Sequence, residues 1–83
     1  MKLELFYFNS CPFCQYVLEV LQNLDIKVDM LDIHENQENL TRLMADTRRK
    51  TVPCLYIDNQ PMFESTDIIN WLQANKSKLP LNN

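Results

Sequence analysis

The segment KLELFYFNSCPFC, residues 2–14, decides how this chain folds. In residues 2–8, apolar and charged side chains first alternate and three aromatics then follow, which is typical of a strand buried on both faces. Two polar residues interrupt this strand, and Pro12 can begin a helix because the first helical position needs no N–H. Helical spacing continues in the apolar residues that follow, Val17, Leu18, Leu21 and Leu24. The segment therefore predicts a strand that leads into an amphipathic helix of about three turns, with Cys11 at the helix start.

Beyond this segment, the apolar pattern predicts three more strands and two more helices. Alternating residues over 26–33 predict a second strand, and apolar residues within 40–44 predict a short helix that ends near Thr47. Residues 54–57 and 61–63, which flank a tight turn, predict an antiparallel hairpin.

A last helix follows the hairpin. We expect Ser65 to cap this helix and Ile68, Ile69 and Leu72 to form its buried stripe, while the tail from residue 79 frays. The complete order is β-α-β-α-β-β-α, in which the first strand, helix and strand form a right-handed crossover between parallel strands. The sequence therefore predicts an α/β fold with a four-stranded mixed sheet and helices on both faces.

Glycine is absent from the chain, so every backbone position with a positive φ must be filled by another residue. Asparagine and aspartate tolerate this region best among the other residues. The candidates are Asn23, Asp25, Asp58 and Asn59.

Length and composition predict one small globular domain, residues 1–83. The net charge is −3, and the basic run at 48–50 is typical of a solvated loop rather than of a nucleic-acid surface. The longest apolar run, residues 5–8, is too short to cross a bilayer, and no signal peptide is recognisable. We therefore expect a cytoplasmic monomer that binds neither nucleic acid nor membranes. In that reducing compartment, three cysteines indicate redox chemistry or metal binding.

Cys11 and Cys14 are the candidate catalytic pair. At a helix start, free backbone N–H groups and the positive end of the helix dipole favour the Cys11 thiolate, which is the attacking species. Cys14 lies one turn later on the same side, where it can resolve a mixed disulfide. The competing interpretations are a zinc site completed by Cys54 and His34, and a pair of inert core cysteines. We assign no metal, because His34 is expected at the far end of its strand, and inert cysteines do not explain Pro12.

Three motifs resemble the dithiol glutaredoxin family, and together they cover essentially the whole chain. The sequence CPFC at 11–14 is similar to the family's Cys-Pro-[Tyr/Phe]-Cys active site, and TVP at 51–53 is similar to its Thr-Val-Pro signature. Residues 63–68 occupy the place of its third glutathione-binding segment, although Glu64 and Ser65 are closer to the Glu-Ser pair of glutathione transferase N-terminal domains. The resemblance implies a thioredoxin fold, which agrees with the predicted element order.

The resemblance also implies a glutathione site. It implies that the peptide bond before Pro53 is cis and that the Val52 backbone forms hydrogen bonds with the cysteine residue of glutathione. The start of the last helix would hold the γ-glutamyl carboxylate in addition to being capped. Either Arg48 or Arg49 would meet the glycyl carboxylate, or both would remain solvated, and Phe13 would pack beside the sulfur. The implied glutathione-binding residues are Phe13, Arg49, Val52, Pro53, Glu64, Ser65 and Thr66.

The sequence departs from the glutaredoxin pattern in three places. Phe8 stands where many members have a lysine that stabilises the thiolate, and Phe63 with Glu64 replaces a Gly-Gly pair. Cys54 directly follows the proline, where it is either an inert strand cysteine or a third redox-active thiol. We therefore expect weaker glutathione binding and a greater contribution from the helix N-terminus to the thiolate.

The implied activity is glutathione-dependent thiol–disulfide exchange, with glutathione as co-substrate and no tightly bound cofactor. Its partners would be disulfide-containing or glutathionylated proteins. Three alternatives stay open: a dithiol reductase fed by thioredoxin reductase, a glutathione-binding or iron–sulfur-binding module, and a glutathione transferase. A rigid turn at Pro12 disfavours the iron–sulfur cluster, and a transferase would need a helical domain for which 83 residues leave no room.

Overall fold

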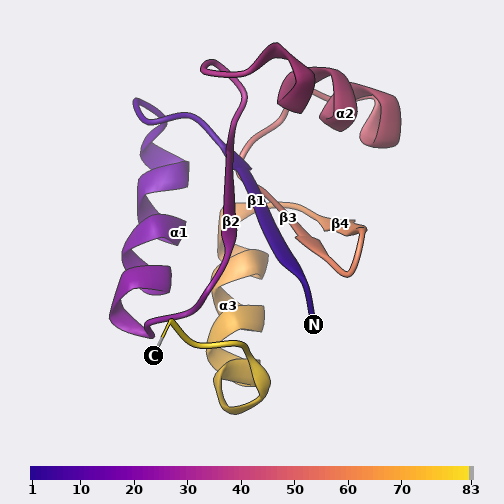
Figure 1. Ribbon diagram of the computed structural model, residues 1–83. Helices are drawn as coiled ribbons and strands as arrows, with labels where there is room; N and C mark the ends of the chain where they lie inside the picture. The colour runs from indigo at the N-terminus through magenta and orange to yellow at the C-terminus, as the bar shows by residue number, and fades with distance from the viewer. Residues whose placement is uncertain (83) are drawn as a thin grey trace.

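The fold is a four-stranded sheet between two helical layers (Figure 1). A computed structural model describes residues 1–82 and confirms the predicted order of elements. The strands are β1 (Leu3–Tyr7), β2 (Asp29–Asp32), β3 (Cys54–Ile57) and β4 (Gln60–Met62). The helices are α1 (Pro12–Asn23), α2 (Gln37–Thr47) and α3 (Ser65–Asn75), and a short 3-10 helix follows at Lys76–Lys78. Among the residues described, no helix is long and apolar enough to cross a membrane.

Strand β1 lies at the centre of the sheet, whose strand order is β2-β1-β3-β4. β1 and β2 are parallel, in a register that places Tyr7 beside Asp32. β3 is antiparallel to both of its neighbours, β1 and β4. The predicted four-stranded mixed sheet is therefore confirmed. Because β1 and β2 run in the same direction, both strands end at the edge of the sheet where the loop to α1 begins.

Two apolar cores lie on opposite faces of the sheet, because successive residues of a strand point to opposite sides. The larger core lies under α1 and α3, and its fully buried members include Leu5, Val17, Leu55, Ile68 and Leu72. The smaller core lies under α2 and is formed by Phe6, Ile33, Leu43, Cys54 and Tyr56. The expectation of helices on both faces is therefore confirmed.

Several element boundaries differ from the prediction. β2 begins at Asp29 rather than at residue 26, because Ile26 pairs with the C-terminal tail instead. β4 begins at Gln60, one residue earlier than predicted. The assignment of Ser65 as the helix cap is wrong: Glu64 occupies the N-cap position, and Ser65 is the first helical residue of α3.

The tail does not fray over the residues that are described. The Lys27 N–H donates a 2.8 Å hydrogen bond to the Pro80 carbonyl, and Leu79 is buried in the larger core. The prediction of fraying is therefore wrong for residues 79–82, which satisfy backbone groups of the segment that follows α1. Asn83 lies outside the described residues.

Among residues 1–82 of this glycine-free chain, four adopt a positive φ: Asp25 (55°), Arg48 (60°), Asp58 (47°) and Asn59 (71°). Three of them were predicted. Asn23 was predicted wrongly, since it lies in the last turn of α1. Arg48 was missed because nothing in its side chain favours this region; it takes the left-handed form as the residue that ends α2.

An ion pair that the sequence did not predict covers the smaller core. Glu4 is buried on β1, and its two oxygens accept hydrogen bonds from the Arg42 guanidinium of α2, at 2.6 and 3.0 Å. The guanidinium carbon also lies 5.5 Å from the ring centroid of Phe6 and 4.8 Å from that of Tyr56. Hydrogen bonding and charge from Arg42 hold the pKa of the Glu4 carboxyl below its usual value. This bidentate pair therefore attaches α2 to the sheet.

Arg42→Met is expected to destabilise the protein by about 2 to 3 kcal/mol, because it leaves the buried Glu4 carboxylate without its partner. The loss is fully present above the ordinary glutamate value of 4.5 and shrinks as the pH falls through the lowered pKa of Glu4. Urea unfolding followed by circular dichroism, at neutral pH and at about pH 3, measures both effects. Lys50→Met removes an exposed cation and serves as the control. Equal unfolding midpoints for the two variants would contradict this role of the pair.

Candidate active site

The site begins where β1 ends and α1 starts. Cys11 is the N-cap residue of α1, with an extended backbone (φ −82°, ψ 116°), and Pro12 is the first helical residue. The Cys11 Sγ accepts a hydrogen bond from the Cys14 backbone N–H at 3.4 Å. The Cys11 N–H in turn donates to the Phe8 carbonyl at 3.2 Å. The predicted position of Cys11 at the helix start is confirmed, and its sulfur takes the place of the oxygen in an ordinary capping side chain.

The two cysteines differ in burial. Cys14 is fully buried, whereas Cys11 retains 6% of its exposure. Burial, followed by the hydrogen bond with Cys11, raises the pKa of Cys14 to about 12. Cys14 therefore keeps its proton at neutral pH. Cys11, in contrast, has a backbone donor at its sulfur and the positive end of the α1 dipole beside it.

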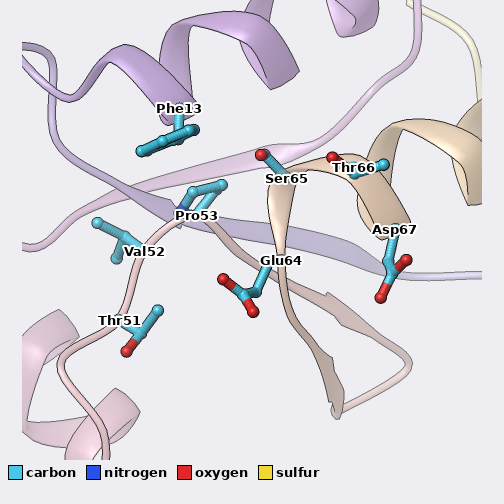
Figure 2. A pocket seen from close by; sticks show the side chains of 8 residues that line it. All are labelled: Phe13, Thr51, Val52, Pro53, Glu64, Ser65, Thr66 and Asp67. Atoms are coloured by element: carbon cyan, nitrogen blue, oxygen red, sulfur yellow. The ribbon is translucent and has the colours of Figure 1, made fainter.

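A pocket of about 350 Å³ opens beside the start of α1 (Figure 2). Its walls come from three segments that are distant in the sequence: the first turn of α1, the loop before β3 and the start of α3. The lining residues are Phe13, Thr51, Val52, Pro53, Glu64, Ser65, Thr66 and Asp67. The structure thus brings together six of the seven predicted glutathione-binding residues. Thr51 and Asp67 were not predicted as binding residues, although both lie within the motifs that indicated the site.

The pocket has an apolar side and a polar side. Figure 2 shows the Phe13 ring above Pro53, with the Ser65 hydroxyl turned toward Phe13. The Phe13 side chain is 60% exposed, so it is accessible to a ligand. In the same view, the Glu64 carboxylate extends toward the wall that contains Thr51.

Backbone groups without an internal partner also belong to residues that line this pocket. The bond between Val52 and Pro53 is cis, as expected, and a second cis bond joins Phe63 to Glu64. Within residues 1–82, neither the N–H nor the C=O of Val52 bonds to another backbone group. The first N–H groups of α3 have no acceptor within the helix, and the Glu64 side chain makes no capping hydrogen bond. An extended peptide and an anion can therefore find backbone partners on two sides of the pocket.

Arg49 is the predicted binding residue that does not line the pocket. Its guanidinium carbon lies 4.2 Å from the centroid of the Phe63 ring. Its backbone N–H donates to the Thr47 hydroxyl at 3.1 Å, and that hydroxyl donates to the Leu43 carbonyl at 2.8 Å. Arg49 is therefore held next to the two segments that line the pocket, with its charge stacked on an aromatic ring.

The other candidate metal ligands do not come together. Among residues 1–82, no group of three or more His, Cys, Asp or Glu side chains is placed to hold a metal ion. Cys54 is fully buried, and burial raises its pKa to about 12, which favours the interpretation as an inert strand cysteine. His34 is exposed and stacks on Phe8 with ring centroids 4.3 Å apart. Phe8 therefore brings an imidazole, instead of a lysine, next to the segment that leads to Cys11.

Sequence and structure comparisons agree on the kind of domain. The profile of the family described as glutathione S-transferase, N-terminal domain, matches residues 5–80. No curated protein sequence gives a match. The crystal structure of a thioredoxin-like protein has a TM-score of 0.76 and 25% sequence identity, and the match covers 88% of this chain and 97% of that protein.

Glutathione transferases also have this domain, as part of longer chains. A trimeric glutathione transferase from Leishmania has a TM-score of 0.77 and 26% identity, over 95% of this chain and 18% of its own. An epsilon-class glutathione S-transferase from the housefly, Musca domestica, has a TM-score of 0.78 and 20% identity, over 93% of this chain and 36% of its own. The chain thus spans only a minor part of these two transferases but nearly all of the thioredoxin-like protein. The thioredoxin-like fold expected from the sequence is confirmed.

Proposed function

The chain belongs to the glutathione S-transferase N-terminal domain family, and from this premise we propose that it is a glutathione-dependent thiol–disulfide oxidoreductase of the glutaredoxin type. One observation carries the proposal: Cys11 caps α1 one turn before Cys14, and Phe13, which stands between them in the sequence, lines a pocket with free backbone groups. The family supplies the link to glutathione. The cysteine pair supplies the chemistry, because a thiolate held at a helix N-terminus is the species that attacks disulfides.

The first step takes place at Cys11. Its thiolate attacks the glutathione sulfur of a mixed disulfide, so that a Cys11–glutathione disulfide forms while the original disulfide breaks. The substrate sulfur leaves as a thiolate and takes a proton from solvent. A second glutathione thiolate then attacks the sulfur of the bound glutathione, which releases oxidised glutathione and restores the Cys11 thiolate. The Cys14 N–H at 3.4 Å from the Cys11 Sγ stabilises negative charge at both ends of this cycle.

Cys14 acts when the substrate is a protein disulfide. Attack by Cys11 then leaves a mixed disulfide between two proteins, and the Cys14 sulfur attacks Cys11 to release the reduced partner. The product is a Cys11–Cys14 disulfide, which two glutathione molecules reduce in turn. The raised pKa of Cys14 fits this order, because the buried thiol does not compete with Cys11 for the substrate.

The pocket accommodates glutathione in an extended form. The free N–H and C=O of Val52 pair with the cysteine residue of glutathione, and the first N–H groups of α3 receive the γ-glutamyl carboxylate. Ser65 and Thr66 lie at that helix start, and Phe13 packs beside the sulfur. Arg49, whose guanidinium stacks on the ring of Phe63 next to the pocket wall at Glu64, supplies the positive charge for the glycyl carboxylate.

The family match favours a second candidate function, glutathione conjugation, because glutathione transferases contain this domain. The two functions make different demands on the cysteines. Disulfide exchange needs the Cys11 sulfur itself, whereas conjugation uses the sulfur of glutathione and needs a site for an electrophile.

A coupled assay separates the two candidates. The protein is mixed with glutathione, glutathione reductase and NADPH, and NADPH oxidation is followed with a glutathionylated peptide as substrate. A parallel reaction measures conjugation of glutathione to an aryl halide. We expect rapid NADPH oxidation and no conjugation above the background rate. Conjugation without disulfide reduction would contradict the proposal and support a transferase.

A further inference from the structure

The backbone of Phe8 bonds to both cysteines of the active-site turn. Its carbonyl accepts the Cys11 N–H at 3.2 Å. Burial, and then the hydrogen bond with Cys11, raise the pKa of Cys14 to about 12, whereas a hydrogen bond with the Phe8 backbone lowers it. Because the N–H is the only donor that a residue's backbone carries, the Phe8 N–H is the group that donates to the Cys14 sulfur. Phe8 therefore holds the main chain of one cysteine and the sulfur of the other.

Phe8 lies just beyond the sheet, so side-chain contacts restrain it. Strand β1 ends at Tyr7, and its pairing with β2 ends at the same residue. The Phe8 side chain is partly buried and packs against the smaller core. Its ring also stacks on the exposed imidazole of His34, with the ring centroids 4.3 Å apart and an angle of 19° between the ring planes. Core packing and this stack therefore both restrain Phe8.

The backbone around His34 is anchored to the end of the sheet. The Ile33 N–H donates to the Tyr7 carbonyl at 2.9 Å, and the Ile33 side chain is buried in the smaller core. The His34 N–H donates to the Asp32 carboxylate at 2.8 Å. Within residues 1–82, the imidazole itself makes no hydrogen bond or ion pair. The imidazole is therefore attached to a fixed backbone, and its specific contact is the Phe8 ring.

We propose that His34 is a positioning residue for the attack of Cys14 on the disulfide at Cys11, because it stacks on the residue whose backbone bonds to both cysteines. This inference rests on the oxidoreductase function proposed above. In that step Cys14 gives its proton to solvent and its sulfur bonds to Cys11. The bond between Cys11 and the glutathione sulfur breaks, and glutathione leaves as a thiolate that takes a proton from solvent. The Phe8 N–H stabilises the negative charge on the attacking Cys14 sulfur, and the stack keeps that N–H in place.

The preceding step, attack by Cys11 on the substrate, depends less on this contact. The Cys11 thiolate is stabilised by the Cys14 N–H at 3.4 Å and by the α1 dipole, and neither involves the Phe8 ring. The Cys14 sulfur, in contrast, is fully buried and receives the Phe8 N–H. Loss of the His34 ring should therefore slow the second step and leave the first nearly unchanged.

His34→Ala removes the ring and leaves the backbone. The reduced protein is mixed rapidly with oxidised glutathione, quenched in acid and analysed by mass spectrometry. This follows the formation of the Cys11–glutathione intermediate and its decay to the Cys11–Cys14 disulfide. We expect formation within about twofold of the wild-type rate and a decay slowed about fivefold, the effect of losing one aromatic pair from the reacting arrangement.

A second ring at position 34 gives a readout that a general loss of stability would not produce. His34→Phe keeps a flat ring on Phe8 without the imidazole nitrogens, and it should restore decay to the wild-type rate. His34→Gln keeps a polar side chain without a ring, and it should repeat the slow decay. Glu35→Gln changes the exposed neighbour of His34 and should behave as the wild type. Circular dichroism checks that each variant is folded.

The outcomes separate this inference from the function on which it rests. Slow decay in His34→Ala and His34→Gln, with normal decay in His34→Phe, supports the positioning role. Decay at the wild-type rate in both variants without a ring overturns it and leaves the oxidoreductase function intact. Slow decay that His34→Phe does not restore also overturns it. A wild-type protein that forms no glutathionylated intermediate overturns the function and this inference together.

Discussion

Cys11→Ser is expected to lose disulfide reduction completely, by at least about 1000-fold, in both the glutathionylated-peptide and the protein-disulfide assays. The reason is that Cys11 alone combines a position at the helix N-cap with a sulfur that receives a backbone N–H. Neither of the other cysteines can replace it. Cys14 and Cys54 are fully buried, and burial raises the pKa of each to about 12. NADPH oxidation in the coupled assay measures the loss.

Cys14→Ser and Cys54→Ala are the matched controls for this prediction. Cys14→Ser should keep most of the activity on a glutathionylated peptide, because that cycle needs only Cys11, and should lose most of the activity on a protein disulfide. Cys54→Ala should retain both activities. Equal losses in Cys11→Ser and Cys14→Ser with the glutathionylated peptide would show that the assigned roles are wrong.

Val52→Pro should raise the KM for a glutathionylated peptide about tenfold or more, with a smaller effect on kcat. Proline has no N–H, so the substitution removes the donor that we assign to the glutathione backbone. The loss of one such hydrogen bond in a desolvated site is worth about 1.4 kcal/mol, which corresponds to a factor of ten. The native Val52 N–H makes no backbone hydrogen bond within residues 1–82, so the fold itself does not lose one. Initial rates over a range of peptide concentrations give KM and kcat separately.

Val52→Ala is the control, because it shortens the side chain and keeps the N–H. Its KM should stay close to that of the wild type, and circular dichroism should show that both variants are folded. If Val52→Pro reduces disulfides with an unchanged KM, the assignment of the pocket to glutathione binding is wrong. The protein would then be better interpreted as a dithiol reductase that receives electrons from thioredoxin reductase, and adding that enzyme with NADPH would test this directly.

The sequence predicted those parts of the structure that depend on local patterns. The alternation in residues 2–8 and the helical spacing after Pro12 placed β1 and α1, and with them Cys11 at the helix start. These features depend on neighbouring residues and on where a proline is tolerated, and not on contacts between distant parts of the chain. Three motifs predicted most of the residues that line the pocket. A family resemblance, and not hydrophobic periodicity, indicated that these motifs lie close together.

Features that depend on contacts between distant residues could not be predicted in the same way. The pair formed by Glu4 and Arg42 joins residues 38 positions apart, and nothing in either local sequence indicates it. The position of Asp32 beside Tyr7 depends on the register between β1 and β2, which the alternation alone leaves undetermined. The residue type of Ser65 favours the cap position, but the preceding Glu64 is the residue that has the extended backbone of a cap.

The unequal size of the two cores has a consequence for local opening of the fold. Helix α2 covers the smaller core, and none of its residues lines the pocket, whereas α1 and α3 share the larger core and supply pocket walls. Amide hydrogen exchange should therefore show α2 exchanging through a partial opening, while β1, α1 and α3 exchange only when the whole domain unfolds. The layer that carries Cys11 and the α3 helix start would remain assembled during such openings. A partner protein that deforms or displaces α2 would then still meet Cys11 and the α3 helix start, whereas the wall at Val52, which packs against the smaller core, would loosen together with α2.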